Sequence, residues 1–313
     1  QMSTKGAAGK NLDHEDYTER IIVNSSLGDE LDNLGFNKKQ ISAIATGKAI
    51  GKDKISDSII SQIITSAVNV DSMDYLLRDN YHCGTHGRII DINRLLLSID
   101  LIDDRELGVD IKALIALEGF LLARISSFRT IYFHKTCRAV QLMITEAMRK
   151  IADEESLFQY DTIEDFLKWD DYILWTHLME NPKSERIMKK IQKRRLLKVV
   201  FESRIELTND NINKNSLKQE LAQKGNVPQE AIFIDLPNSP NVPYSHIDET
   251  RPNIIKSFKR TMSHEKQKVK LEDYSLFFDQ FKGQLKILRV YTWPKYRKVL
   301  ERVAKIVIRD KFT

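Results

Sequence analysis

The sequence has few cysteines, few prolines and no long apolar run, and each absence narrows the class of protein. Only two cysteines occur among 313 residues, Cys83 and Cys137, and neither has the neighbours of a zinc site. A disulfide framework is therefore excluded, and isolated thiols are typical of packing residues in a reducing compartment. No apolar run approaches the roughly 20 residues that a membrane span needs. These absences predict a soluble cytoplasmic protein without a membrane partner.

Charged residues are abundant but unevenly distributed. Residues 1–182 carry 20 Lys and Arg against 29 Asp and Glu, whereas residues 183–313 carry 29 against 15. A basic half attracts polyanions, so nucleotide phosphates, nucleic acid or an acidic face of another subunit are candidate partners. Solvated helix faces would give the same composition, and this alternative stays open.

Apolar periodicity predicts a mainly α fold, with a helical core over 11–200 and a smaller α+β lobe over 201–313, after a disordered lead-in at residues 1–10. The prolines are concentrated in the lobe, where they interrupt short β-like runs. The expected helices are a helical region from Leu12 to a stop at Gly35, a short helix capped by Asn37, and 55–68, 71–79, 111–151, 161–180 and 183–200. The expected lobe elements are strands at 199–207, 231–236 and 284–293, and a basic helix opened by Pro294.

The segment NVDSMDYLLRD carries an acidic and aromatic helix face. Helical periodicity places Asp71, Tyr75 and Asp79 on one side, together with Arg78. The opposite side, expected to pack, comprises Met73, Leu76 and Leu77. A carboxylate can bind a metal, and a tyrosine can hydrogen-bond a sugar or a base. A solvated helix face with salt bridges would show the same pattern.

A second group lies on the expected helix 111–151, in the segment ARISSFRTIYFHK. Helical spacing brings Arg124 and Lys135 near one stripe, with Tyr132 beside it, so a common pocket wall is geometrically reasonable. Taken by themselves, Tyr132 and Phe133 are equally typical of core aromatics, and Lys135 of a solvated lysine.

These two segments resemble HD-domain metal-dependent phosphohydrolases, specifically the deoxynucleotide triphosphohydrolases of the dGTPase-like and SAM-and-HD-domain type. The resemblance implies an HD-type helical core in which Asp71 ligates a metal, and Tyr75 and Asp79 contact the sugar and triphosphate region. Where relatives often carry a basic residue after the metal ligand, this sequence has Ser72.

The same resemblance assigns roles on the second segment and at the start of the first helix. It implies that Arg124 reaches a phosphate, that Tyr132 packs on the deoxyribose and that Lys135 also binds substrate. In the triplet Asp13-His14-Glu15, it implies that His14 is a catalytic acid or base, a role that suits a group titrating near neutrality. Without the resemblance, His14 would be interpreted as a surface histidine.

The sequence lacks one part of the resembled pattern. The family holds a divalent metal (Mg, Mn, Fe, Ni or Zn) with an upstream His and an adjacent His-Asp pair in addition to the later Asp, and no His-Asp dipeptide occurs here. The matches run in family order from residue 14 onward, which predicts an N-terminally incomplete chain that is inactive by itself.

The leading hypothesis is therefore a phosphohydrolase that, when complete, converts a deoxynucleoside triphosphate to deoxynucleoside and triphosphate. The resemblance further implies a homo-oligomer that binds a regulatory nucleotide. The alternative is a non-catalytic HD-like protein that binds nucleotides, or nucleic acid through its basic C-terminal half.

Overall fold

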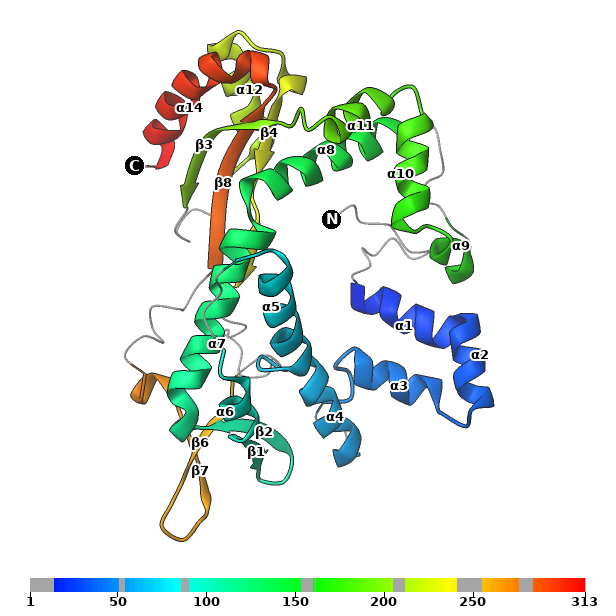
Figure 1. The fold of residues 1–313 in the computed structure, drawn as a ribbon, viewed down its shortest axis with the longest axis vertical. Coiled ribbons are helices and arrows are strands. Elements are labelled where there is room, and N and C mark those ends of the chain that lie inside the picture. The colour runs from blue at the N-terminus through cyan, green and yellow to red at the C-terminus, as the bar shows by residue number, and fades with distance from the viewer. Residues whose placement is uncertain are drawn as a thin grey trace. The chain divides into compact units, whose positions relative to one another are not determined.

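The computed structural model describes residues 14–50, 54–85, 90–152, 160, 162–204, 212–240, 255–275 and 284–312 (Figure 1). The chain divides into two compact units that alternate along the sequence. The first comprises 1–127, 158–168 and 241–283, and the second 128–157, 169–240 and 284–313. The single boundary expected near residue 200 does not coincide with this division, and the lead-in expected at residues 1–10 lies outside the described residues.

Helices dominate the described chain, so the expectation of a mainly α fold is confirmed. None of the described helices combines the length and the apolar character that crossing a membrane requires. The helices of the first unit are α1 (His14–Asn24), α2 (Ser26–Asn33), α3 (Lys38–Ala45), α4 (Ile55–Thr65), α5 (Val70–His82), α6 (Ile92–Leu96), α7 (Leu114–Ser127) and α9 (Ile163–Leu167).

Local signals determine several of these helix ends. Gly35 follows α2 with a positive φ of 81°, and the Asn37 side chain accepts a hydrogen bond from the Gln40 amide at 3.1 Å, as a helix N-cap does. The helical region 55–79 is interrupted. Asn69 caps α5 by accepting from the Ser72 amide at 2.6 Å, while its Nδ2 donates to the Ser66 carbonyl, so α4 and α5 are separate helices.

A four-stranded sheet in the first unit was not expected from the sequence. Its strands are β1 (Ile99–Ile102), β2 (Glu106–Asp110), β6 (Ser257–Arg260) and β7 (Lys266–Val269), in the order β1-β2-β6-β7. Asp103 and Asp104 turn the β1–β2 hairpin with positive φ angles, and β2 pairs in parallel with β6. A Cβ on Gly108 would lie 2.4 Å from Ile102 Cδ1, so any side chain there would displace the buried Ile102 side chain of β1.

The core of the first unit lies where α5, α6 and α7 meet. Leu76 of α5, Leu95 of α6 and Phe120 of α7 are fully buried in one apolar cluster. The buried Glu118 of α7 accepts a hydrogen bond from the Ser275 hydroxyl, which satisfies one of its oxygens.

The second unit begins with a correction to the expected helix 111–151. A π-helical turn (Phe128–Tyr132) follows α7, and the helical run stops at Phe133 and His134 before α8 (Lys135–Ile151) starts. His134 caps α8 by accepting from the Thr136 amide at 3.3 Å. Arg124 and Lys135 therefore do not share one continuous helix.

The other helices of the second unit are α10 (Asp171–Glu180), α11 (Glu185–Gln192), α12 (Lys214–Gly225) and α14 (Arg297–Phe312). The helix expected over 183–200 ends at Gln192, because Arg194 has a positive φ of 52° and the chain then enters a strand. The strands are β3 (Lys198–Arg204), β4 (Ile232–Asp235), β5 (Asn238–Pro240) and β8 (Gln284–Thr292), which confirms the three expected strands.

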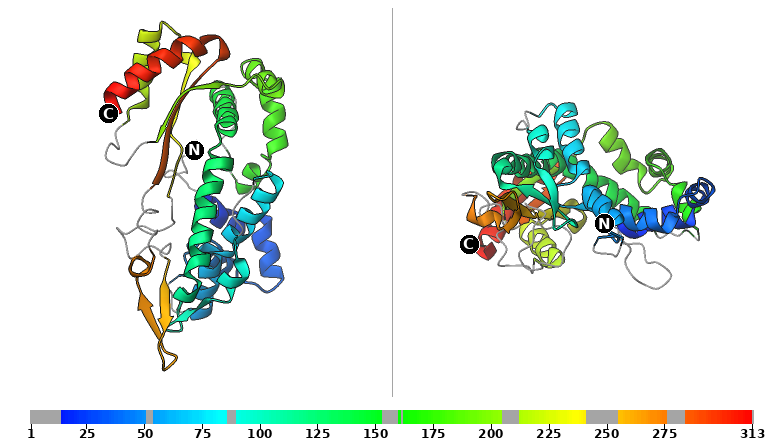
Figure 2. Two further views of the ribbon diagram at one scale, coloured as in Figure 1. Left: turned by 60° about the vertical axis from the view of Figure 1, so that its left-hand side comes forward. Right: turned by 90° about the horizontal axis from the view of Figure 1, so that it is seen from below.

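Strand β8 is the centre of this sheet and pairs antiparallel with β3, β4 and β5. Helices α12 and α14 pack on one face of the sheet (Figure 2), where Leu288 and Val290 of β8 are fully buried. The residues that alternate with them along β8 face the other side of the sheet. The Arg289 guanidinium donates to the Phe133 carbonyl at 2.5 Å, and the Tyr291 hydroxyl donates to the Lys135 carbonyl at 3.0 Å.

Helix α8 is held to this unit by a buried ion pair. Arg138 donates from Nε and Nη2 to the two oxygens of Asp235, at 3.0 and 2.5 Å, and Asp235 is only 2% exposed. The carboxylate raises the pKa of Arg138. Removing the arginine would leave a buried carboxylate unpaired, which is far more costly than losing an exposed pair.

We expect Arg138→Met to lower the free energy of unfolding by about 3 kcal/mol. Lys189→Met, which removes the exposed Lys189–Glu185 pair of α11, should change it by less than about 0.5 kcal/mol. All three tryptophans (169, 175 and 293) lie in the second unit, so urea unfolding followed by tryptophan fluorescence reports on it. Equal losses in the two variants would contradict the prediction.

Candidate functional site

Helix α5 presents its predicted residues in two different environments. Asp71 is exposed in the first turn, whereas Tyr75 and Asp79 are half-buried. Met73 and Leu76 are buried as expected, but Leu77 is 46% exposed and does not belong to the packed side. Arg78 is exposed and forms an i,i+4 ion pair with Asp74. Arg78 therefore lies on a solvent-exposed part of the helix surface, whereas Tyr75 and Asp79 lie on a half-buried part.

The half-buried part brings together residues from the two predicted segments. The Nη1 of Arg124, in the last turn of α7, donates a hydrogen bond to the Tyr75 hydroxyl at 2.7 Å. The two residues are 49 positions apart, and both are half-buried. A guanidinium and a phenol held together offer several hydrogen-bond donors to an anionic or hydroxylated ligand.

A second polar contact between α5 and α7 was not predicted from the sequence. Asn80 Nδ2 donates to the hydroxyl of the buried Ser127 at 2.8 Å and to the Leu76 carbonyl at 2.6 Å. The Asn80 Oδ1 accepts from the Thr85 hydroxyl at 2.6 Å. This network fixes the C-terminal turns of both helices, and therefore the position of Arg124 relative to Tyr75. The only local signal was an asparagine inside a helix, where its amide needs partners.

The described residues do not assemble a metal centre. His14 is exposed at the start of α1, with its Nε2 3.1 Å from Glu15 Oε1, and Asp13 lies outside the described residues. Within the described ranges, which include His14 and Asp71, no group of three or more His, Cys, Asp or Glu side chains could hold a metal ion. A divalent cation of the kind expected needs more ligands than Asp71 alone supplies.

Tyr132 and Lys135 belong to the second unit, whereas Arg124 belongs to the first. The Tyr132 ring meets Phe128 edge-on at 5.1 Å in a cluster with Phe133 and Ile287. Phe133 is buried, which favours its interpretation as a core aromatic. Lys135 has an exposed side chain at the first turn of α8 and lines a pocket of about 260 Å³.

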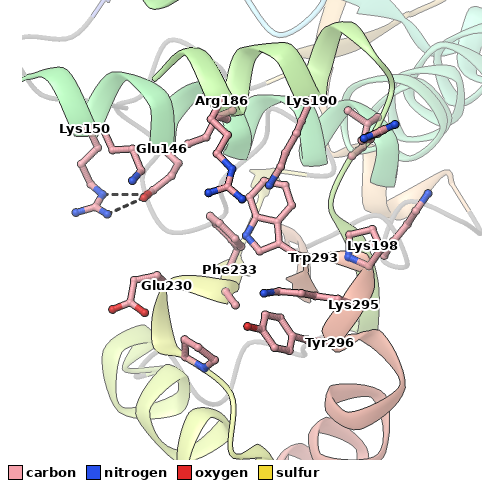
Figure 3. Close-up of a pocket in the computed structure, with 17 residues that line it drawn as sticks. Glu146, Lys150, Arg186, Lys190, Lys198, Glu230, Phe233, Trp293, Lys295 and Tyr296 are labelled. Atoms are coloured by element: carbon pink, nitrogen blue, oxygen red, sulfur yellow. Dashed lines mark hydrogen bonds and ion pairs between the residues drawn. The ribbon is translucent and has the colours of Figure 1, made fainter. Parts of the chain in front are cut away.

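A larger pocket, of about 680 Å³, lies within the second unit and was not expected as a site. It lies between α8, α11, β4 and the 3-10 turn Pro294–Tyr296 (Figure 3). The signal in the sequence is the basic run Lys189–Lys198, whose charges suit phosphate or nucleic acid. The run alone does not show which of its side chains meet in the fold.

The comparison with protein families gives a match over most of the chain. The family described as "HD associated region" matches residues 90–308, which is more than half of the sequence. The chain belongs to this family.

Two curated proteins are similar to parts of this chain. An uncharacterized protein of Methanocaldococcus jannaschii is 37% identical over 131 residues, covering 40% of this chain and 28% of the relative. The Dictyostelium discoideum homolog of the deoxynucleoside triphosphate triphosphohydrolase SAMHD1 is 28% identical over 227 residues, covering 69% of this chain and 43% of the relative. The chain thus spans less than half the length of either protein.

A solved structure is similar over nearly the whole chain. The crystal structure of a hypothetical protein from Aquifex aeolicus matches with a TM-score of 0.70 and 26% identity, covering 92% of this chain and 72% of that one. The family match and the similarity to the Dictyostelium homolog support an HD-domain family for this chain.

We expect the Arg124–Tyr75 contact to be measurable as a coupling energy. In a double-mutant cycle with Tyr75→Phe and Arg124→Met, unfolding followed by circular dichroism should give about 1 to 2 kcal/mol of coupling, as for a hydrogen bond with a charged donor. Tyr81 lies on the same helix but is 83% exposed. Tyr81→Phe combined with Arg124→Met should be additive within about 0.5 kcal/mol. Additivity in both cycles would show that the contact contributes nothing.

Proposed function

We propose that this protein is part of a metal-dependent phosphohydrolase that acts on deoxynucleoside triphosphates and releases deoxynucleoside and triphosphate. The hydrogen bond between Arg124 and Tyr75 carries the proposal, because it joins the two segments in which the sequence resembles such enzymes. The 28% identity with a relative that bears the name of a deoxynucleoside triphosphate triphosphohydrolase supports the same substrate class.

The first unit supplies groups suited to the phosphates. The Arg124 guanidinium has five N–H donors, so it can hydrogen-bond Tyr75 and a phosphate at the same time. Asp79 and Tyr75 are half-buried on the same helix and are assigned to the sugar and triphosphate region. We assign His14 as a proton donor or acceptor near the scissile phosphate from the same resemblance, since histidine is the side chain most often used for that role.

The resemblance assigns Tyr132 to the deoxyribose. Tyr132 has a half-buried ring fixed by Phe128, and a rigid ring can discriminate a deoxyribose from a ribose by shape. The exposed ammonium of Lys135 is assigned to the triphosphate. Subunit association and a regulatory nucleotide are likewise proposed from the resemblance.

The metal is proposed to take Asp71 as one ligand. The described residues do not fit a complete metal site, since they supply one carboxylate at this position and no cluster around it. The other ligands must therefore come from outside the described residues.

A second candidate function is nucleotide or nucleic-acid binding without catalysis. The absence of a metal-binding cluster among the described residues and the basic second half of the chain favour it. Binding of this kind would weaken steeply with salt and would produce no turnover.

We expect the 313-residue chain by itself not to hydrolyse deoxynucleoside triphosphates, because its described residues do not form a metal centre. The measurement is release of triphosphate from each of the four substrates with Mg²⁺ or Mn²⁺, with and without EDTA. Turnover that EDTA abolishes, in material of verified mass, would contradict this expectation.

The substrate proposal is tested by ligand selectivity in the absence of metal. Arg124→Ala should weaken binding of a deoxynucleoside triphosphate by about 10- to 150-fold, as expected for loss of roughly 1.5–3 kcal/mol of charge-assisted contact, with little effect on a deoxynucleoside. Tyr132→Ala should narrow the preference for deoxyribose over ribose. Melting temperatures are measured alongside, since residues that only pack would lower stability without changing selectivity. Equal weakening of all ligands would contradict the assignments.

A further inference from the structure

Tyr132, the residue assigned above to the deoxyribose, lies in a π-helical turn. The Phe133 amide donates to the Phe128 carbonyl at 2.7 Å, so this turn holds one residue more than a turn of α-helix. Such turns are rare, and they occur frequently at functional sites. The Tyr132 ring meets Phe128 edge-on within the turn, with ring centroids 5.1 Å apart. The orientation of Tyr132 therefore depends on what keeps this turn in its π-helical form.

Two side chains of strand β8 hold the backbone where the turn ends. The Arg289 guanidinium donates to the Phe133 carbonyl at 2.5 Å. The Tyr291 hydroxyl donates to the Lys135 carbonyl at 3.0 Å. Because residues two apart on a strand face the same side of the sheet, one strand fixes the backbone on both sides of His134.

Arg289 is an unusual residue for this position, because it is only 4% exposed. Its Nε donates to Glu202 at 2.7 Å, but Glu202 is itself exposed. Ile287, on the same face of β8, is buried in an apolar cluster with Phe133. Taking a guanidinium out of water costs more than burying an apolar side chain of similar volume. The arginine is thus explained by the carbonyl that it holds, and not by packing.

Tyr291 contributes a second bond of the same kind. Its side chain is fully buried, and burial raises the pKa of its phenol, so the hydroxyl keeps the proton that it donates. Phenylalanine would fill the same space. The function of the hydroxyl is therefore its bond to the Lys135 carbonyl.

We propose that Arg289 and Tyr291 are positioning residues, which hold the π-helical turn of Tyr132 and thereby set the preference for deoxyribose over ribose. The proposal rests on the function proposed above, in which the Tyr132 ring discriminates the two sugars by shape. Discrimination by shape requires a ring that is held in place, because a ring that can move aside admits the additional hydroxyl group. Arg289 and Tyr291 are assigned no contact with the ligand, so both act through Tyr132.

The test compares affinities for matched pairs of deoxynucleoside and ribonucleoside triphosphates, measured on the full chain in EDTA so that hydrolysis plays no part. We expect Arg289→Met to lose most of the preference for deoxyribose, which discrimination by shape makes roughly 10- to 200-fold in the wild type. Tyr291→Phe should reduce it by about 2- to 10-fold, as for loss of one hydrogen bond. Tyr132→Ala combined with Arg289→Met should show the preference of Tyr132→Ala alone, because Arg289 acts through the ring.

Thr292→Val is the matched control for Tyr291→Phe. Thr292 is the next residue of β8, is fully buried, and donates from its hydroxyl to the Ala231 carbonyl at 2.7 Å. The substitution removes the same kind of bond from the same strand and leaves residues 132–135 without any change in their printed partners on β8. The preference should therefore remain that of the wild type. Melting temperatures are measured for every variant.

The outcomes distinguish this proposal from the function on which it rests. If Tyr132→Ala narrows the preference and neither Arg289→Met nor Tyr291→Phe does, this proposal alone is wrong. If Tyr132→Ala has no effect, or the wild type shows no preference, the assignment of Tyr132 to the sugar is wrong as well. A preference in Thr292→Val that falls as far as in Tyr291→Phe would show a role in stability only and would overturn the proposal. Tyr291→Phe decides the outcome if Arg289→Met does not fold.

Discussion

The packing of α5 against α7 determines the geometry of the first unit. Leu76 and Phe120 are fully buried, and two polar contacts between the helices, Arg124 to Tyr75 and Asn80 to Ser127, fix their relative register. A shift of either helix by one residue would turn Tyr75 away from Arg124 by about 100°. The apolar core therefore supplies stability, and the polar contacts specify which side chains meet.

Features encoded by neighbouring residues were predictable from the sequence. The N-caps at Asn37 and Asn69 follow from single side chains that satisfy free amides, and strand β8 follows from a run of apolar and β-branched residues before Pro294. The resemblance of the two segments implied that Arg124 and Tyr75 contact the same ligand. Their direct hydrogen bond was not predicted, because it depends on a contact across 49 residues.

The features that were missed depend on distant partners. The β1–β2 hairpin is short and charged, and it is stabilised by the parallel partner β6, about 150 residues away. The helical run ends at Phe133 and His134 although the local sequence favours helix, since Phe133 is buried with Ile287 and its carbonyl accepts from Arg289. The large pocket likewise combines α8, α11 and the segment after β8, so its composition could not be read from any one stretch.

The alternation of the two compact units has a consequence for how this chain can be divided. The backbone passes from one unit to the other five times, near residues 127, 157, 168, 240 and 283. A single proteolytic cut between residues 128 and 283 would thus leave segments of both units on each side of it, and no contiguous fragment contains one complete unit alone. Each unit is completed only after segments from distant parts of the sequence have met, so its formation bears the loop-closure entropy that slows folding.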